Sequence, residues 1–169
     1  MNTTPDYRFR DVQENVRHHF GFLFERGFHI VSIIFVDREM EHWSVIMASN
    51  KCLIKIFNDQ DEIMLAISTL QIYHEAGFFD LEELAYLASR GERYPGRYLT
   101  STLTEEQQFE RLANLLKDYI DHIVFLPGEN LYGDEDELRK TLMQIRGAMT
   151  RDNRLEKIWF YFQDLLHES

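Results

Sequence analysis

The sequence predicts an α+β fold in which helical segments flank an antiparallel meander of four strands. Four short apolar runs occupy residues 28–37, 42–49, 51–58 and 62–70. The polar connectors are residues 38–41, 49–50 and 58–61, the last two overlapping the ends of the runs, so each is only two to four residues long. Connectors this short join antiparallel neighbours, because a parallel crossover needs about a dozen residues or more. Each run is therefore expected to pair with the next one along the chain.

The segment before the first strand has the pattern of an amphipathic helix. Its apolar residues recur at spacings of three and four over residues 6–26, and they are Phe9, Val12, Val16, Phe20 and Leu23. This spacing places them on one helical face. Gly27 follows as a suitable residue for the C′ position, where a left-handed conformation ends many helices. We expect one helix that stops just before the first strand.

The strands differ in how their two faces are patterned. Residues 28–37 are apolar on both faces, which predicts that the first strand is at least partly covered on both sides. Lys51 and Lys55 mark one face of the third strand as partly solvated. In the fourth strand, Ile63, Leu65 and Ile67 are predicted to face the core.

The second half of the sequence reads as helices that pack on the sheet. A short helix capped by Asp80 is predicted to run to about residue 89. A long helix is predicted over residues 104–125, because Thr104-Glu105-Glu106-Gln107 has the form of a capping box. Further helical patterns follow over residues 133–149 and 154–166, giving three to four helices. We interpret residues 1–169 as one α+β domain, strand-rich over 28–70 and helix-rich over 78–169.

Composition excludes several classes of protein. The single cysteine, Cys52, excludes an internal disulfide and any CxxC zinc or redox site. No apolar run approaches the roughly 20 residues of a membrane span, and the charged N-terminus does not resemble a signal peptide. The net charge of −11 is shared by both halves, so no basic surface predicts nucleic-acid binding. We therefore expect a cytoplasmic protein that binds neither nucleic acid nor membrane.

The sequence contains no strong motif for a catalytic or metal site, and we predict no catalytic residue, no cofactor and no metal. The seven histidines form no HxxxH or HExxH pair, and the adjacent His18 and His19 are expected to point to different parts of a helix surface. A zinc site assembled in space from histidines and glutamates remains an alternative to surface histidines; its residues would be His29, His42 and His74 with Glu39, Glu41 or Glu75.

Three further motifs have a structural interpretation beside a functional one. The acidic run of residues 134–137 lacks the alternation of a calcium loop and reads as a helix start. Asp118, Asp121 and His122 share one helix face, which suits acid–base chemistry or a solvated surface, and we favour the surface. Cys52 lies in an apolar strand and is predicted to be a buried structural thiol.

The loop of residues 90–98 is the strongest candidate for binding. It gathers three arginines and two tyrosines in an otherwise acidic chain: Arg90, Arg93, Tyr94, Arg97 and Tyr98. Arginine and tyrosine are enriched among residues that dominate protein interfaces. The alternative is that the tyrosines anchor the loop while the arginines pair with nearby acids. We predict protein binding for these five residues.

The layout also resembles a broad group of small bacterial α+β proteins. The resemblance rests on Phe22-Leu23 and Gly27-Phe28 after a leading helix, on Asp61-Glu62-Ile63-Met64-Leu65, and on a long helix with Glu105-Glu106-Gln107, Leu112 and Leu115. It covers roughly residues 20–125. Some proteins of this kind look like immunity proteins of polymorphic toxin systems, and many have no assigned role. The resemblance to the immunity proteins implies a protein partner and carries over no catalytic residue.

These observations favour a non-enzymatic protein-binding module that acts on a basic partner. An acidic chain would attract such a partner through long-range electrostatics. Two alternatives stay open at this point. One is a small-molecule-binding domain or enzyme with its pocket between sheet and helices, and the other is a homo-oligomer that uses an exposed apolar face.

Overall fold

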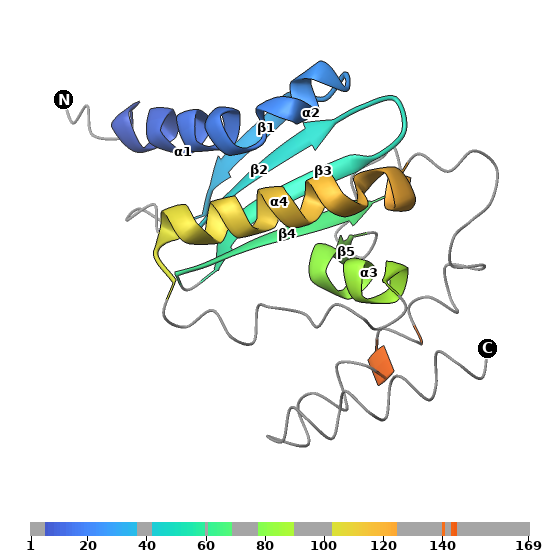
Figure 1. The fold of residues 1–169 in the computed structure, drawn as a ribbon. Coiled ribbons are helices and arrows are strands. Elements are labelled where there is room, and N and C mark those ends of the chain that lie inside the picture. Colours follow the sequence, from blue (N-terminus) through green and yellow to red (C-terminus); the bar gives the residue numbers. More distant parts are fainter. Residues whose placement is uncertain are drawn as a thin grey trace, which may run out of the picture. The chain divides into compact units, whose positions relative to one another are not determined.

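A computed structural model describes residues 6–36, 42–59, 61–68, 78–89 and 103–124, together with positions 140, 143 and 144 (Figure 1). The described elements, in chain order, are α1 (Asp6–His19), α2 (Gly21–Glu25), β1 (His29–Phe35), β2 (Trp43–Ala48), β3 (Leu53–Asp59), β4 (Glu62–Ser68), β5 (Phe79–Asp80), α3 (Leu81–Ala88) and α4 (Glu105–Val124). The chain divides into two compact units. One comprises residues 1–81 and 98–118 and contains the sheet, and the other comprises residues 82–97 and 119–169.

The sheet confirms the α+β class and the antiparallel meander. Its strands follow the sequence order β1-β2-β3-β4-β5, and every neighbouring pair is antiparallel. The sheet has five strands where the sequence predicts four. The additional strand, β5, pairs Phe79 with Ile67 and Asp80 with Ala66. Two residues are too few to show an alternating pattern, which is why sequence analysis assigns Asp80 only to a helix start.

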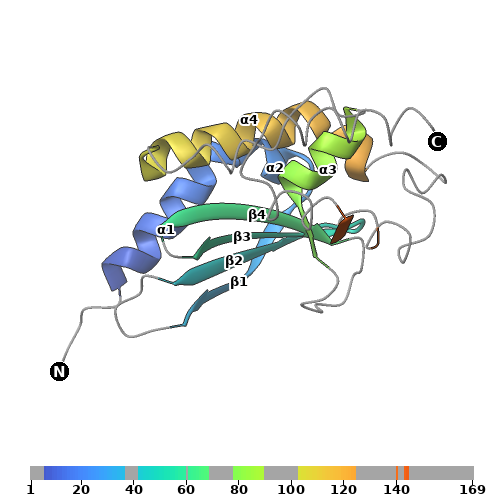
Figure 2. The same cartoon turned by 90° about the horizontal axis from the view of Figure 1, so that it is seen from below.

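One face of the sheet supports α1 and α4, which lie on the same side of it (Figure 2). Cross-strand partners line this face in rows, so that Val45 pairs with Ile56 and Ile56 with Leu65. Trp43 of β2 stacks against Phe109 of α4, and Phe35 of β1 lies 6.4 Å from Phe9 of α1 between ring centroids. The core of this unit is therefore the layer between the sheet and these helices. Ile63, Leu65 and Ile67 are buried in it, as predicted.

A β-bulge changes the faces of β1. Ile30 pairs with Met47, whereas Ser32 pairs with Ile46, so the register shifts between Ile30 and Ser32. After the shift, Ile33 and Phe35 pair with the helix-facing residues Val45 and Trp43. Ile33 and Phe35 therefore share the helix-facing side with Ile30, whereas strict alternation would place them on the opposite side from Ile30. The first strand is predicted to be at least partly covered on both sides; Val31 is 52% exposed and Ile34 is 48% exposed, so any cover at these two residues is partial.

The predicted helix over residues 6–26 is two helices. The helical geometry is interrupted at Phe20, which has φ −108° and ψ 22°, and α2 begins at Gly21. The end of α2 is as expected: Gly27 has φ +85°, and the amides of Gly27 and Phe28 donate to the carbonyls of Phe24 and Leu23. This pair of bonds is a Schellman motif, which favours glycine at the left-handed position. It turns the chain directly into β1.

The helical second half is confirmed in part. α3 and α4 occupy the positions predicted for the first two helices, while the helices predicted over residues 133–149 and 154–166 lie outside the described ranges, apart from single helical positions at 140, 143 and 144. Among the helices described, none combines the length and apolar composition needed to cross a bilayer.

Candidate functional site

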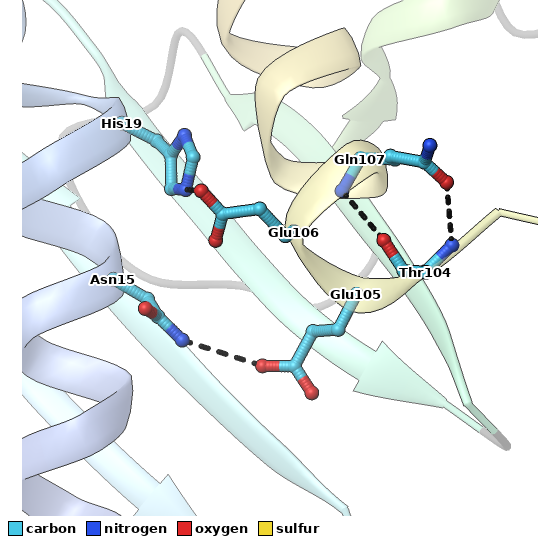
Figure 3. Close-up of polar contacts among 6 residues, drawn as sticks. All are labelled: Asn15, His19, Thr104, Glu105, Glu106 and Gln107. Carbon is cyan, nitrogen blue, oxygen red and sulfur yellow. Dashed lines mark hydrogen bonds and ion pairs between the residues drawn. The ribbon is translucent and has the colours of Figure 1, made fainter.

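A cluster of side chains suited to coordination chemistry lies where the C-terminal end of α1 meets the first turn of α4. It consists of His18, His19 and Glu106, and we call it the His–Glu cluster. One potential ligand atom from each residue lies within 4.8 Å of the other two. Figure 3 shows two of its members, with Glu106 of α4 directed toward His19 of α1.

The local sequence explains why the histidines lie at a helix end. The last turn of α1 carries three basic residues, Arg17, His18 and His19. Cationic side chains are favoured there because the unpaired carbonyls give a helix C-terminus partial negative charge. The interruption at Phe20 ends α1 immediately after His19. The imidazoles of His18 and His19 then meet edge to face, with ring centroids 4.7 Å apart.

The first turn of α4 is fixed by the predicted capping box. The Thr104 hydroxyl accepts a hydrogen bond from the Gln107 amide at 3.3 Å, and the Gln107 side-chain oxygen accepts one from the Thr104 amide at 3.0 Å (Figure 3). These reciprocal bonds satisfy two backbone donors that a helix start leaves unpaired. They also set the direction in which Glu105 and Glu106 leave the helix.

Both of these glutamates contact α1. Asn15 donates to Glu105 Oε1 at 3.3 Å, and His19 Nε2 lies 3.2 Å from Glu106 Oε1 (Figure 3). The His19 side chain is 7% exposed, whereas the Glu106 side chain is 64% exposed. The approach to Glu106 is within ion-pair distance, but within the described residues the buried His19 Nε2 makes no hydrogen bond.

Aromatic packing holds the His19 ring in place. Its imidazole stacks on Phe109, with centroids 5.4 Å apart and planes 7° from parallel. Phe109 in turn stacks on Trp43 of β2 at 6.0 Å and 9°. A continuous stack therefore joins α1, α4 and the sheet. Because aromatic contacts of this kind restrict ring rotation, His19 presents Nε2 to Glu106 from a fixed position.

The cluster departs from what sequence analysis expects. His18 is exposed and His19 mostly buried, so the two side chains do differ in environment, but their ligand atoms are not separated. The third member comes from a helix 87 residues away in sequence. A short motif search does not reveal such a cluster, because the spacing between helices is set by the tertiary fold.

The zinc alternative drawn from other histidines is not assembled by the described residues. His29 pairs with Ala48 at one end of the β1–β2 pair, while the His42 carbonyl bonds to the Val36 amide at the other end. A strand rises by about 3.3 Å per residue, so His29 and His42 lie too far apart to coordinate the same ion. His42 lies 3.6 Å from Asp59 instead. His74, Glu39, Glu41 and Glu75 lie outside the described residues.

The remaining predicted positions have simpler outcomes. Cys52 is buried, as predicted, and burial raises the pKa of its thiol to about 11. Asp118, Asp121 and His122 are exposed on α4, in agreement with a solvated helix face. The residues predicted to bind protein, Arg90, Arg93, Tyr94, Arg97 and Tyr98, lie outside the described ranges, so their role stays a prediction. The acidic run of residues 134–137 also lies outside them.

A second surface of interest is the free edge of the sheet. β1 pairs with β2 on one side, and no described strand pairs with its other side. Three apolar side chains are exposed here: Val31 at 52%, Ile34 at 48% and Val36 at 76%. We call these three residues the β1 edge surface. β1 contains no lysine or proline, which natural edge strands use to block pairing with another chain.

Comparison with known proteins does not assign the chain to a family. No protein-family model matches the chain, and neither a curated protein nor a solved structure matches it significantly.

Proposed function

We propose that this protein is a cytoplasmic, non-enzymatic protein-binding module of the immunity type, and that it binds a basic protein partner through the β1 edge surface. The observation that carries the proposal is the exposure of Val31 and Ile34 in an edge strand and of Val36 directly after it. An unpaired strand edge offers backbone hydrogen bonds to an incoming strand, and exposed apolar side chains add affinity. The partner would add a strand beside β1.

The charge of the chain supports a basic partner. A net charge of −11 raises the rate at which a cationic protein approaches and makes that rate sensitive to salt. The apolar edge would then supply the contacts that hold the complex together. The net charge would thus speed the approach of the partner, while the β1 edge surface would hold it in the complex.

Packing beneath α4 supports binding at an outer edge in preference to an internal pocket. The sheet residues on the helix-covered face are closely packed, and Val45, Met47, Ile54 and Ile56 have no measurable exposure. These four side chains are apolar, whereas a small ligand is oriented by converging polar groups.

The proposal is tested with purified products of the genes that flank the gene for this protein. Binding of each product is measured by interferometry at low and high ionic strength, using the wild type, Ile34→Lys and Val36→Lys. Met143→Lys is the matched control, because Met143 is also exposed and the change in charge is the same. We expect one basic product to bind, with association slowed by salt and affinity weakened about tenfold or more only by the β1 variants.

Two results would contradict the proposal. One is that no flanking product binds at micromolar concentration. The other is a light-scattering mass of two chains that Ile34→Lys reduces to one, which would mean that the edge pairs with a second copy of the protein. Alanine variants of Arg93, Tyr94 and Tyr98 in the same assay test the predicted binding loop separately.

A further inference from the structure

We propose that the His–Glu cluster binds one divalent transition-metal ion, with Zn²⁺ as the best match. Two imidazole nitrogens and one carboxylate oxygen form a donor set that Zn²⁺ accepts in proteins. Three protein ligands leave one tetrahedral position for water. This inference concerns a surface different from the β1 edge and does not depend on partner binding.

The distances in the cluster suit such an ion. Zn²⁺ bonds to nitrogen and oxygen are about 2.0–2.2 Å long, so two ligands of a tetrahedral site are about 3.3 Å apart. His19 Nε2 and Glu106 Oε1 already lie 3.2 Å apart. The remaining separations reach up to 4.8 Å. His18 and Glu106 are exposed, so their side chains can close this difference by small rotations without disturbing the core.

The buried nitrogen of His19 is a second observation that points to a bound cation. Its Nε2 is enclosed by protein and makes no hydrogen bond within the described residues. Burying a polar atom without a hydrogen bond is unfavourable, and a bound ion would offset this by accepting the lone pair of the nitrogen. Stacking on Phe109 keeps the ring turned so that this nitrogen faces Glu106.

The local electrostatics favour a cation at this position. The cluster lies at the C-terminal end of α1, where the helix dipole is negative. The N-terminal end of α4 has the opposite polarity, but its first turn carries Glu105 and Glu106. Glu105 is oriented by Asn15 beside the cluster and adds a second carboxylate to the surroundings. The bound ion would thus link two helices that are distant in sequence.

The experiment titrates Zn²⁺ into the full-length, tag-free chain and measures affinity and stoichiometry by calorimetry and by competition with a chromophoric chelator. His18→Gln and Glu106→Gln each remove one ligand at an exposed position, so folding should be preserved, which circular dichroism checks. His29→Gln is the control, because His29 is exposed and lies outside the cluster. Co²⁺ is used as a second probe, since its visible absorption reports tetrahedral coordination.

We expect one equivalent of Zn²⁺ per wild-type chain and a rise in thermal stability with added Zn²⁺. Loss of an outer-shell partner weakens metal sites about 10–100-fold, and loss of a ligand should weaken binding at least as much. His18→Gln and Glu106→Gln should therefore lose the stoichiometric binding, while His29→Gln keeps it. The proposal is overturned if the wild type does not bind one equivalent, or if both cluster variants bind as tightly as the wild type.

Discussion

The side-chain oxygen of Gln108 in α4 accepts a hydrogen bond of 2.7 Å from the backbone amide of Ile63 in β4. The nitrogen of the same side chain donates to the carbonyls of Asp61 at 3.1 Å and Leu103 at 3.3 Å. Gln108 is buried, so its amide is satisfied by protein groups. This one residue fixes the start of α4 against the β3–β4 turn. It thereby fixes where Glu106 stands relative to α1.

Replacing Gln108 by leucine should destabilise the protein by about 2–3 kcal/mol. The change removes three hydrogen bonds and leaves the Ile63 amide without its acceptor in a buried position. Urea denaturation measures the free energy of unfolding. Asn114→Leu on the exposed side of the same helix is the control and should change stability by less than about 0.5 kcal/mol. Equal effects of the two substitutions would refute the anchoring role of Gln108.

Thr104→Ala should cost about 1 kcal/mol, because the hydroxyl that accepts from the Gln107 amide is lost. Thr104→Ser retains the hydroxyl and should remain close to the wild type. If the capping box acts as a unit, adding Gln107→Ala to Thr104→Ala should cost less than the sum of the two single changes. Thermal or urea unfolding of the four variants measures this coupling, and strict additivity would argue against it.

Phe109→Ala should be among the most damaging single substitutions in the described core, at about 3–5 kcal/mol. The ring is fully buried and contacts His19, Phe20 and Trp43. Its removal opens a cavity and also ends the stack that orients His19. Trp43 fluorescence, measured in a Trp159→Phe background, should change in the folded variant. Phe109→Leu fills part of the space and should cost clearly less.

Cys52 should resist alkylation in the folded protein and react readily in urea. The thiol is 1% exposed, and desolvation raises its pKa from 9.0 to about 11, against smaller lowering effects of Ser49 and Lys51. At pH 8 it is therefore both protonated and shielded, whereas the thiolate is the reactive form. Iodoacetamide labelling followed by mass spectrometry measures the rate. Rapid labelling under native conditions would contradict this environment.

The same pKa shift predicts a pH dependence of stability. The unfolded thiol releases its proton near pH 9.0, before the folded thiol does, so unfolding becomes more favourable as the pH rises. The contribution of Cys52 is complete below pH 9.0 and is lost as the pH rises through about 11. Cys52→Ala lacks this group and should show a shallower decline over that interval. Parallel declines in urea midpoint would rule out the predicted contribution.

Much of the local structure follows from short-range patterns. Short polar connectors dictate antiparallel pairing, and alternation places Ile63, Leu65 and Ile67 in the core. Gly27 ends α2 because only a left-handed residue completes the Schellman motif. The Thr104–Gln107 capping box also forms as predicted. Each of these features depends on residues that are close together in the chain.

Other features of the fold could not be predicted from local sequence patterns. The bulge in β1 places Ile33 on the same side as Ile30, against strict alternation, because register depends on how β1 meets β2. β5 is a strand only through its pairing with β4. The break at Phe20 interrupts an amphipathic pattern that continues unchanged through it. The bulge and β5 both depend on pairing with another strand, which a local pattern does not contain.

By itself, the sequence determined the α+β class, the antiparallel order of the first four strands, the helix boundaries set by Gly27 and Thr104, and the burial of Cys52. Only the tertiary structure decided which apolar side chains of β1 remain exposed and which polar groups meet across α1 and α4. The physical reason is that hydrogen-bonded turns and caps are local, whereas the approach of His19 to Glu106 requires Gln108 and Phe109 to position a helix 87 residues further along the chain.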